Sequence, residues 1–389
     1  MHYKFPKITH INDVLPAIEG RDEFIVAQKD GYQVVNYVVM MEDSFPAVED
    51  VNSAIRRECR GLVFNLEGNL INRRYHKFFN VNERDETRFE KVDFTQPHVI
   101  LDKLDGSMVS PCYINGNIRW MTKMGVTDTS MQAEVFVALR PDYVELAKDY
   151  LDSGYTPVFE WCSRKQRIVV DYLEDQLVLT AMRDIYSGNY LLQDELERVG
   201  ERYGIPVVKA YDYQAENIID IVRGLEDAEG VVVRFDTGYM LKVKADWYVL
   251  RHKSKDAITR EKNVLDYIVN DRVDDVLPFL QVEDHVRLLK FQDQFWRGVK
   301  ENVVIYERYW NTVVASGLDR KAYALNWKPT IEKQDSFAPN YVFGRFSGRD
   351  GLQMIKDEIS KNIGTQTRID GVRHLWGGHL WDYTFEGDV

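Results

Sequence analysis

Residues 101–110 place a lysine, a carboxylate and a glycine where an apolar run turns. Lys103 follows the run, Asp105 stands two residues later, and Gly106 comes next. A lysine amine is a nucleophile only when it is neutral, which requires burial or neighbouring positive charge. We predict that Lys103 is a covalent nucleophile, provided that other parts of the chain create such an environment.

Two carboxylates and two further lysines stand in or beside apolar strands. Glu160 lies between two aromatic residues, where a carboxylate needs a partner such as a ribose hydroxyl. Glu229 leads directly into an apolar strand. Lys242 and Lys244 are two residues apart in a predicted strand, so their side chains share a face. Two ammonium groups on one face predict an anion such as a polyphosphate above them.

A basic stretch lies between residues 56 and 79. Aromatic residues are interleaved with cations there, which is typical of a surface that binds bases and phosphates. An amphipathic sheet with a solvated basic face is the alternative. The residues concerned are Arg56, Arg57, Arg60, Arg73, Arg74, Tyr75, Lys77, Phe78 and Phe79.

Alternating apolar patterns predict strands around these residues. Hairpin turns are expected at 29–31, 67–68, 115–116 and 236–238, and further strands at 157–162, 168–170, 177–182 and 205–209. Helices are expected at 141–153, 194–203 and 216–225, and from a cap at Thr129 or Ser130 to 139. The pattern predicts a mixed α+β domain with mainly antiparallel sheets over residues 1–253.

Helical spacing replaces strand alternation beyond Lys253. Apolar residues recur every three to four positions over 256–271, 282–315 and 352–363. We therefore predict a separate all-α domain over residues 254–389. No internal repeat interrupts either domain.

Composition limits the class of protein. The chain has 389 residues, 44% of them hydrophobic, and a net charge of -12, which argues against a protein that coats nucleic acid non-specifically. An enzyme whose positive charge is confined to one groove remains compatible. Three widely spaced cysteines suggest neither disulfides nor a zinc site. With no signal-like or membrane-spanning apolar run, we expect a protein of the cytoplasm.

The ordered motifs resemble the phage RNA ligase 1 family, the tRNA-repair ligases of the covalent nucleotidyltransferase superfamily. The resemblance covers about residues 34–252. It rests on Glu58-Cys59-Arg60-Gly61, Lys77-Phe78-Phe79-Asn80 with Asn82-Glu83, Lys103-Leu104-Asp105-Gly106-Ser107, Phe159-Glu160 with Arg167-Ile168-Val169, Glu229-Gly230, and Lys242-Val243-Lys244-Ala245-Asp246-Trp247-Tyr248.

This resemblance implies a role for each matching residue. Lys103 would carry AMP taken from ATP, and Lys242, Lys244 and Glu229 would join it in catalysis. The residues expected to contact the nucleotide are Tyr37, Arg60, Lys77, Phe79, Lys103, Gly106, Glu160, Lys242 and Lys244.

The resemblance also implies a divalent metal, Mg²⁺ with Mn²⁺ as a substitute, at Glu229 and Asp274. Asp274 stands next to Asp275, and an acidic pair of this kind is otherwise a solvated helix start. One departure concerns Met124-Gly125, where the family has a basic residue before the glycine. Here Lys123 stands one place earlier, which leaves its role in doubt.

The implied reaction joins an RNA 5′-phosphate to a 3′-hydroxyl through lysyl-AMP and RNA-adenylate. Like charge from Lys77, Lys242 and Lys244 would leave the Lys103 amine partly neutral near pH 7. The expected partners are ATP and single-stranded or broken-loop RNA, tRNA included, and the expected state is a monomer in the cytoplasm, that of the host if the chain is phage-encoded. The alternatives are an ATP-dependent DNA ligase or capping enzyme, both of which carry an OB barrel, and a non-catalytic RNA-binding relative.

Overall fold

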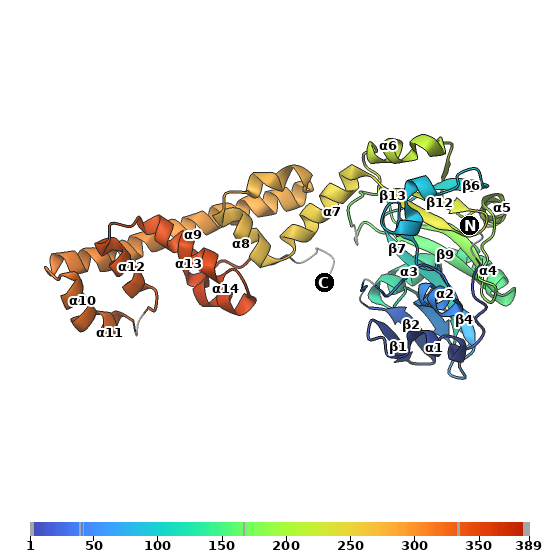
Figure 1. Ribbon diagram of the computed structural model, residues 1–389, viewed down its shortest axis with the longest axis horizontal. Coiled ribbons are helices and arrows are strands. Elements are labelled where there is room, and N and C mark those ends of the chain that lie inside the picture. The colour runs from blue at the N-terminus through green and yellow to red at the C-terminus, as the bar shows by residue number, and fades with distance from the viewer. Residues whose placement is uncertain (1–3, 39, 42, 166–167, 333–334, 384–389) are drawn as a thin grey trace. The chain divides into compact units, whose positions relative to one another are not determined.

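The chain forms two compact units, Met1–Val249 and Leu250–Val389. The computed structural model describes residues 4–38, 40–41, 43–165, 168–332 and 335–383 (Figure 1). Arg167, part of a motif quoted above, lies outside these residues. The first unit combines antiparallel sheets with helices, and the second is helical wherever it is described as regular structure. The predicted fold class, α+β followed by an all-α region, is confirmed.

Three sheets build the first unit. The first has the order β1-β2-β3-β4, with β1 (Phe24–Lys29), β2 (Tyr32–Tyr37), β3 (Arg60–Phe64) and β4 (Leu70–Asn72). The second, β10-β9-β7-β8, contains β7 (Ser107–Ile114), β8 (Asn117–Met121), β9 (Tyr155–Cys162) and β10 (Gln176–Asp184). The third, β11-β6-β12-β13-β5, contains β5 (Phe79–Asn80), β6 (His98–Asp102), β11 (Ala210–Tyr211), β12 (Gly230–Phe235) and β13 (Met240–Lys244). Only β13 and β5 pair in parallel among these described strands.

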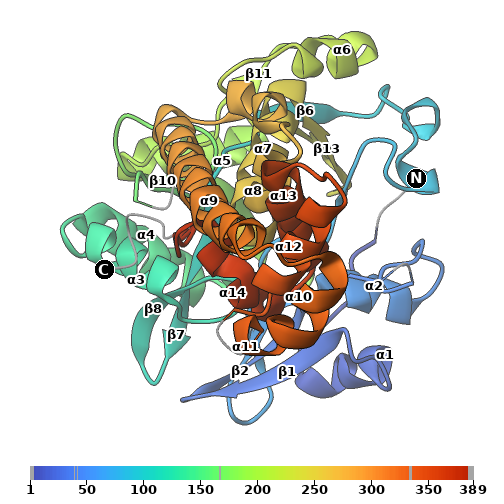
Figure 2. The same ribbon diagram turned by 90° about the vertical axis from the view of Figure 1, so that its left-hand side faces the viewer.

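Helices cover one face of the second sheet. Here α3 (Asp128–Ala138) packs on β8, α4 (Pro141–Asp152) on β9 and α5 (Gln193–Tyr203) on β10 (Figure 2). The alternation of β9 sends Phe159 and Trp161 into this apolar layer, so Glu160 points to the opposite face. The other helices of this unit are η1 (Ile11–Asp13), α1 (Leu15–Ile18), α2 (Val51–Glu58), η2 (Asp85–Thr87), η3 (Phe89–Lys91), η4 (Ala215–Asn217) and α6 (Ile218–Arg223), and α7 (Asp246–Ile258) contains the division between the units.

Most predicted hairpins are present, and three local predictions are wrong. Asn115 and Gly116 both adopt positive φ, of 50° and 78°, as a tight Asn-Gly turn requires. The first long helix is capped by Thr127 instead of Thr129 or Ser130, because the Thr127 hydroxyl accepts the N–H of Ser130. Residues 168–170 form no strand, because their backbone N–H groups are used elsewhere, as described below. Residues 205–209 do not form the predicted strand either. The strand in this region, β11, begins at Ala210.

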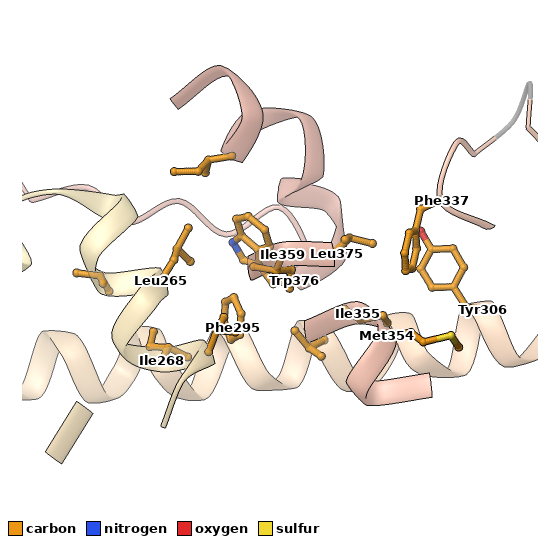
Figure 3. Packing of buried hydrophobic residues seen from close by; sticks show 14 of the residues in the cluster. Leu265, Ile268, Phe295, Tyr306, Phe337, Met354, Ile355, Ile359, Leu375 and Trp376 are labelled. Atoms are coloured by element: carbon orange, nitrogen blue, oxygen red, sulfur yellow. The ribbon is translucent and has the colours of Figure 1, made fainter. Parts of the chain in front are cut away.

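A single long helix organises the second unit. The 34-residue α9 (Val282–Ala315) carries buried side chains along one side, and Figure 3 shows other helices packing onto it. Phe295 meets Trp376 with ring centroids 5.6 Å apart, and Tyr306 meets Phe337 at 5.2 Å. The remaining elements are α8 (Glu261–Val269), η5 (Val273–Asp275), η6 (Leu277–Phe279), α10 (Arg320–Asn326), α11 (Lys328–Ile331), α12 (Ala338–Phe346), α13 (Gly351–Asn362), α14 (Gln366–Val372) and η7 (Arg373–Trp376).

Candidate active site

Lys103 lines a cavity of about 220 Å³ between the second and third sheets. Its backbone N–H donates to the carbonyl of Gly230 at 3.0 Å, which fixes the turn after β6 against β12. Predicted residues that line the same cavity are Arg60, Lys103, Gly106, Glu160 and Lys242. Residues that the sequence did not single out also line it, among them Asp102, Thr180 and Arg234.

Glu229 bridges two of the predicted lysines. One of its carboxylate oxygens, Oε1, lies 2.6 Å from Nζ of Lys103 and 3.1 Å from Nζ of Lys244. Glu229 is only 5% exposed, whereas Lys103 keeps 21% of its side chain accessible. The sequence predicts positive neighbours for Lys103, and the structure adds a buried carboxylate that offsets part of their charge.

Lys242 stands on the same strand as Lys244, and the two alternate with buried residues of β13. Its ammonium lies 5.0 Å from the centroid of the Phe78 ring. Burial lowers the pKa of Lys242 to about 7, and the positive charges of Arg60 and Lys77 act in the same direction. Lys242 is therefore divided between its charged and neutral forms near neutral pH.

Glu160 faces the cavity from β9, and Gly106 lies directly against this strand. A Cβ on Gly106 would stand 2.4 Å from the carbonyl oxygen of Trp161 and 3.2 Å from Cγ of Glu160. The turn therefore requires glycine for a close approach of two backbones. Burial raises the pKa of Glu160 to about 8, and the negative charge of Glu229 contributes to the shift.

A second cluster of predicted residues gathers around Tyr37. The ammonium groups of Lys77 and Lys123 lie 5.2 Å and 4.8 Å from the centroid of its ring. Although burial alone would raise the pKa of Tyr37, the charges of Lys77, Arg60 and Lys123 hold it below its usual value. The structure thus places Lys123, whose role the sequence leaves in doubt, among the cations of the site.

Phe79 occupies a different position from the one that the motif suggests. Only 1% of Phe79 is exposed to solvent. Its ring lies under Lys77, and the ring centroid is 5.4 Å from the ammonium. Its neighbour Phe78 lines the cavity instead. Successive side chains of a strand point to opposite faces, so only one of the two aromatic residues can face the cavity.

Asp105 holds the lysine turn in place, a role that sequence reasoning missed. Its Oδ2 accepts the backbone N–H groups of Val169 at 2.7 Å and Val170 at 2.8 Å. Its Oδ1 accepts the hydroxyl of Tyr248 at 2.8 Å. These bonds explain why 168–170 is not a strand. A buried carboxylate needs several donors, and the motif alone does not reveal which distant segments supply them.

Much of the basic stretch at 56–79 is structural. For three of its arginines, both predictions, a surface that binds bases and phosphates and a solvated basic face, are wrong. Arg57, Arg73 and Arg74 are 3%, 0% and 2% exposed. Arg73 pairs with Glu58 at 3.0 Å, and Arg183 from β10 binds the same carboxylate at 2.8 Å. Buried arginines are tolerated where carboxylates and carbonyls satisfy them. Arg60, Lys77 and Phe79 are the predicted nucleotide contacts that come from this stretch.

Asp274 belongs to η5 in the helical unit and is exposed beside Asp275. Within the described part of the chain, no group of three or more His, Cys, Asp or Glu side chains could hold a metal by itself. Metal binding at Glu229 and at Asp274 stays a prediction. None of the described helices combines the length and apolar character needed to cross a lipid bilayer.

Comparison with known proteins decides between the families that such a lysine site could represent. Residues 58–248, which contain every motif from Arg60 to Lys244, match the family described as RNA ligase. Over this segment, which is just under half of the chain, the protein matches the RNA ligase family. The resemblance predicted from the motifs is thereby confirmed, as is the prediction that the protein is an RNA ligase and an enzyme.

Two relatives extend the match beyond the family segment. The ligase is 28% identical over 278 residues to a Thermovibrio ammonificans protein whose name gives RNA ligase as its expected activity, covering 68% of this chain and 70% of that one. It is 24% identical over 311 residues to RNA ligase 1 of bacteriophage TS2126, covering 76% of each. Each alignment is longer than the first unit, which ends at Val249. Both alignments therefore include residues of the second unit.

Solved structures of ATP-dependent RNA ligases are more distant. An archaeal ATP-dependent RNA ligase is 18% identical with a TM-score of 0.45, covering 63% of this ligase and 64% of that chain. A Naegleria gruberi RNA ligase variant with ATP and Mn is also 18% identical, with a TM-score of 0.39, covering 46% and 58%.

Proposed function

We propose that the cavity binds ATP and that Lys103 becomes the carrier of AMP. The lysine nitrogen attacks the α-phosphorus, a phosphorus–nitrogen bond forms, and the bond to the leaving pyrophosphate breaks. The amine must give up a proton, and the carboxylate of Glu229 at 2.6 Å is the nearest acceptor. This ion pair beside a cavity lined by Arg60 and Lys242 is the observation that carries the proposal.

The remaining site residues have roles that suit a triphosphate. Arg60, Lys242 and Lys244 stabilise charge that builds up as pyrophosphate leaves. Lys77, held over the Tyr37 ring, extends this positive region. Glu160, with its pKa raised to about 8, can donate a proton to a ribose oxygen near neutral pH or accept a ribose hydroxyl when ionised.

A divalent cation, Mg²⁺ with Mn²⁺ as a substitute, suits this set of donors. Burial raises the pKa of Glu160, and the negative charge of Glu229 adds to this shift. Magnesium is commonly held by one or two carboxylates together with substrate phosphates, so it needs no larger protein cluster. When bound, the ion would neutralise phosphate charge. Glu229 is the first candidate for its carboxylate.

We propose that the acceptor of AMP is the 5′-phosphate of RNA, and that a 3′-hydroxyl then displaces the AMP. Residues 1–253 would form the adenylyltransferase domain, and residues 254–389 would select the RNA. In support, the helical unit contains a hollow of about 590 Å³ lined by Arg308, Tyr309 and Trp327, among others. Aromatic rings beside a guanidinium suit unpaired bases and phosphates.

The proposed setting follows from the same features. Broken-loop RNA, tRNA included, is the proposed natural substrate, and the proposed active form is a monomer. The three cysteines are buried and unpaired, which suits the reducing cytoplasm.

The test is covalent labelling with α-labelled ATP or GTP and magnesium. We expect an acid-stable label with ATP that disappears in Lys103→Ala and persists in Lys148→Ala, a substitution of an exposed lysine on α4. An unlabelled protein, or a label unchanged in Lys103→Ala, would contradict the proposal. Circularisation of 5′-phosphorylated single-stranded RNA, compared with sealing of nicked duplex DNA, distinguishes an RNA ligase from a DNA ligase. Label from GTP in place of ATP, without joining of either substrate, would indicate a capping enzyme.

A further inference from the structure

A ladder of aromatic and basic side chains follows the outer strand of the third sheet. Lys209, Tyr211 and Tyr213 are two residues apart and share one side of an extended segment around β11. The rings of Tyr211 and Tyr213 are parallel within 4°, with centroids 4.8 Å apart. The ammonium of Lys209 lies 4.8 Å from the centroid of Tyr211.

This ladder stands next to the nucleophile in the sheet. β11 is an outer strand of its sheet, beside β6, the strand that leads into Lys103 (Figure 2). The backbone N–H of Asp102 donates to the carbonyl of Lys209 at 2.8 Å, and Asp102 itself lines the cavity. Asp102 therefore separates Lys209 from Lys103. Tyr211 pairs with Ile100 and packs with it on the face of the sheet that carries the Ile218 cluster.

We propose that Lys209, Tyr211 and Tyr213 form a stacking platform for the terminal nucleotide of the RNA strand that receives AMP. The inference rests on the proposed function and adds the place where RNA is held. A base continues the stack of parallel rings, and the ammonium of Lys209 pairs with a phosphate of the strand. Such platforms combine aromatic faces with local cations and bind single strands independently of sequence.

Charge and burial favour this occupant. Lys209 is exposed, and both tyrosines are half-buried, so each ring retains accessible surface. Asp102 offsets part of the charge of Lys209, so the rings must provide most of the binding. In a chain with net charge -12, an exposed lysine beside a ring pair, on the strand next to the one that leads into Lys103, is a local exception to the overall charge.

Two ordinary explanations compete with the platform. A lysine on an outer strand prevents pairing with other sheets, and both tyrosines also pack against the cluster that contains Ile100 and Ile218. Packing alone requires apolar volume, whereas stacking requires a ring. Replacement of each tyrosine by leucine or by phenylalanine separates the two explanations.

The experiment uses the full-length protein and a 5′-phosphorylated single-stranded RNA with 2-aminopurine at its first nucleotide. With the wild type, we expect binding to quench the fluorescence. Tyr213→Leu and Tyr211→Leu should weaken RNA binding about tenfold or more and abolish quenching, whereas the phenylalanine variants should retain both. Lys209→Ala should lower the slope of log affinity against log salt by about 0.7. Tyr186→Leu, at an exposed tyrosine of the same unit, is the control.

Labelling by α-labelled ATP separates failure of this inference from failure of the proposed function. The leucine variants should be labelled within about twofold of the wild type, because the ladder lies outside the nucleotide cavity. Normal melting and labelling with unchanged RNA affinity would overturn the platform. If the leucine variants do not fold, absence of quenching in the wild type would overturn it equally. Loss of label in the wild type would instead reject the proposed function.

Discussion

A single carboxylate oxygen of Glu229 holds both Lys103 and Lys244, whereas burial and like charge lower the pKa of Lys242 to about 7. Lys103 and Lys244 each gain a negative partner at 2.6 and 3.1 Å. Lys242 is buried, and Arg60, Lys77 and the other two lysines surround it with like charge. Its charge can therefore respond to the arrival of an anion, and this response can be measured.

We predict that the wild type takes up protons when ATP binds at pH 8. The pKa of Lys242 is lowered to about 7 without nucleotide, so at pH 8 most molecules carry a neutral amine there. A triphosphate favours the charged form and raises that pKa, so binding draws a proton from solution. Calorimetry in buffers of different ionisation enthalpy measures the number of protons, up to about one.

Lys242→Arg is the matched variant for this measurement, because arginine remains charged throughout this range. It should bind ATP with clearly less proton uptake at pH 8 than the wild type. At pH 5.5, where Lys242 is already charged, the two proteins should behave alike at this position. Equal uptake at pH 8 would show that another group is responsible, with Glu160 the first alternative.

Pairing between distant elements fixes the framework around these residues. Glu58 at the end of α2 binds Arg73, which follows β4, and Arg183 on β10. Both members of each pair are fully buried. Although burial opposes ionisation, the two arginines lower the pKa of Glu58 to about 2. The carboxylate therefore links the first sheet to the second.

We predict that Glu58→Gln destabilises the first unit by about 3–5 kcal/mol, because two buried guanidinium groups lose their counter-charge. Urea denaturation followed by circular dichroism measures the change. Glu134→Gln, which breaks the partly exposed pair with Arg119, should cost no more than about 1 kcal/mol.

The effect has a defined pH dependence. A lowered native pKa stabilises the fold above the unfolded value near 4.5, and this contribution is lost as pH falls towards about 2. The difference between the wild type and Glu58→Gln should therefore shrink below pH 4.5. A constant difference down to pH 2.5 would mean that packing, and not charge, accounts for the cost.

The same elements show what sequence could predict and what it could not. Turns with strong local preferences, such as Asn115-Gly116, and the long periodic helix 282–315 were predictable, because neighbouring residues determine them. The lysine motif and its acid and base partners were also predictable as a set. The roles of Asp105 and Arg73 were not, since each depends on donors or acceptors more than ten residues away that only the fold brings near.

At the scale of the whole chain, the two units have separate cores. We expect the first unit to carry out adenylation and the helical unit to select the RNA. The cavity with Lys103 is lined by residues of Met1–Val249, and the helical core from Ile258 to Trp381 belongs to the other unit. Separate cores allow each unit to fold without the other. The family segment, residues 58–248, lies within the first unit alone. The first step of the reaction should therefore not need the helical unit.

We predict that a fragment of residues 1–253 folds and is labelled by ATP at Lys103 within about threefold of the full chain. Joining of single-stranded RNA should fall by about tenfold or more, because the fragment lacks the hollow that contains Tyr309 and Trp327. Full-length Trp327→Leu should reproduce part of this loss while its labelling stays unchanged. If the folded fragment joins RNA as well as the full chain, the helical unit does not select RNA; if it folds but takes no label, the unit takes part in adenylation itself.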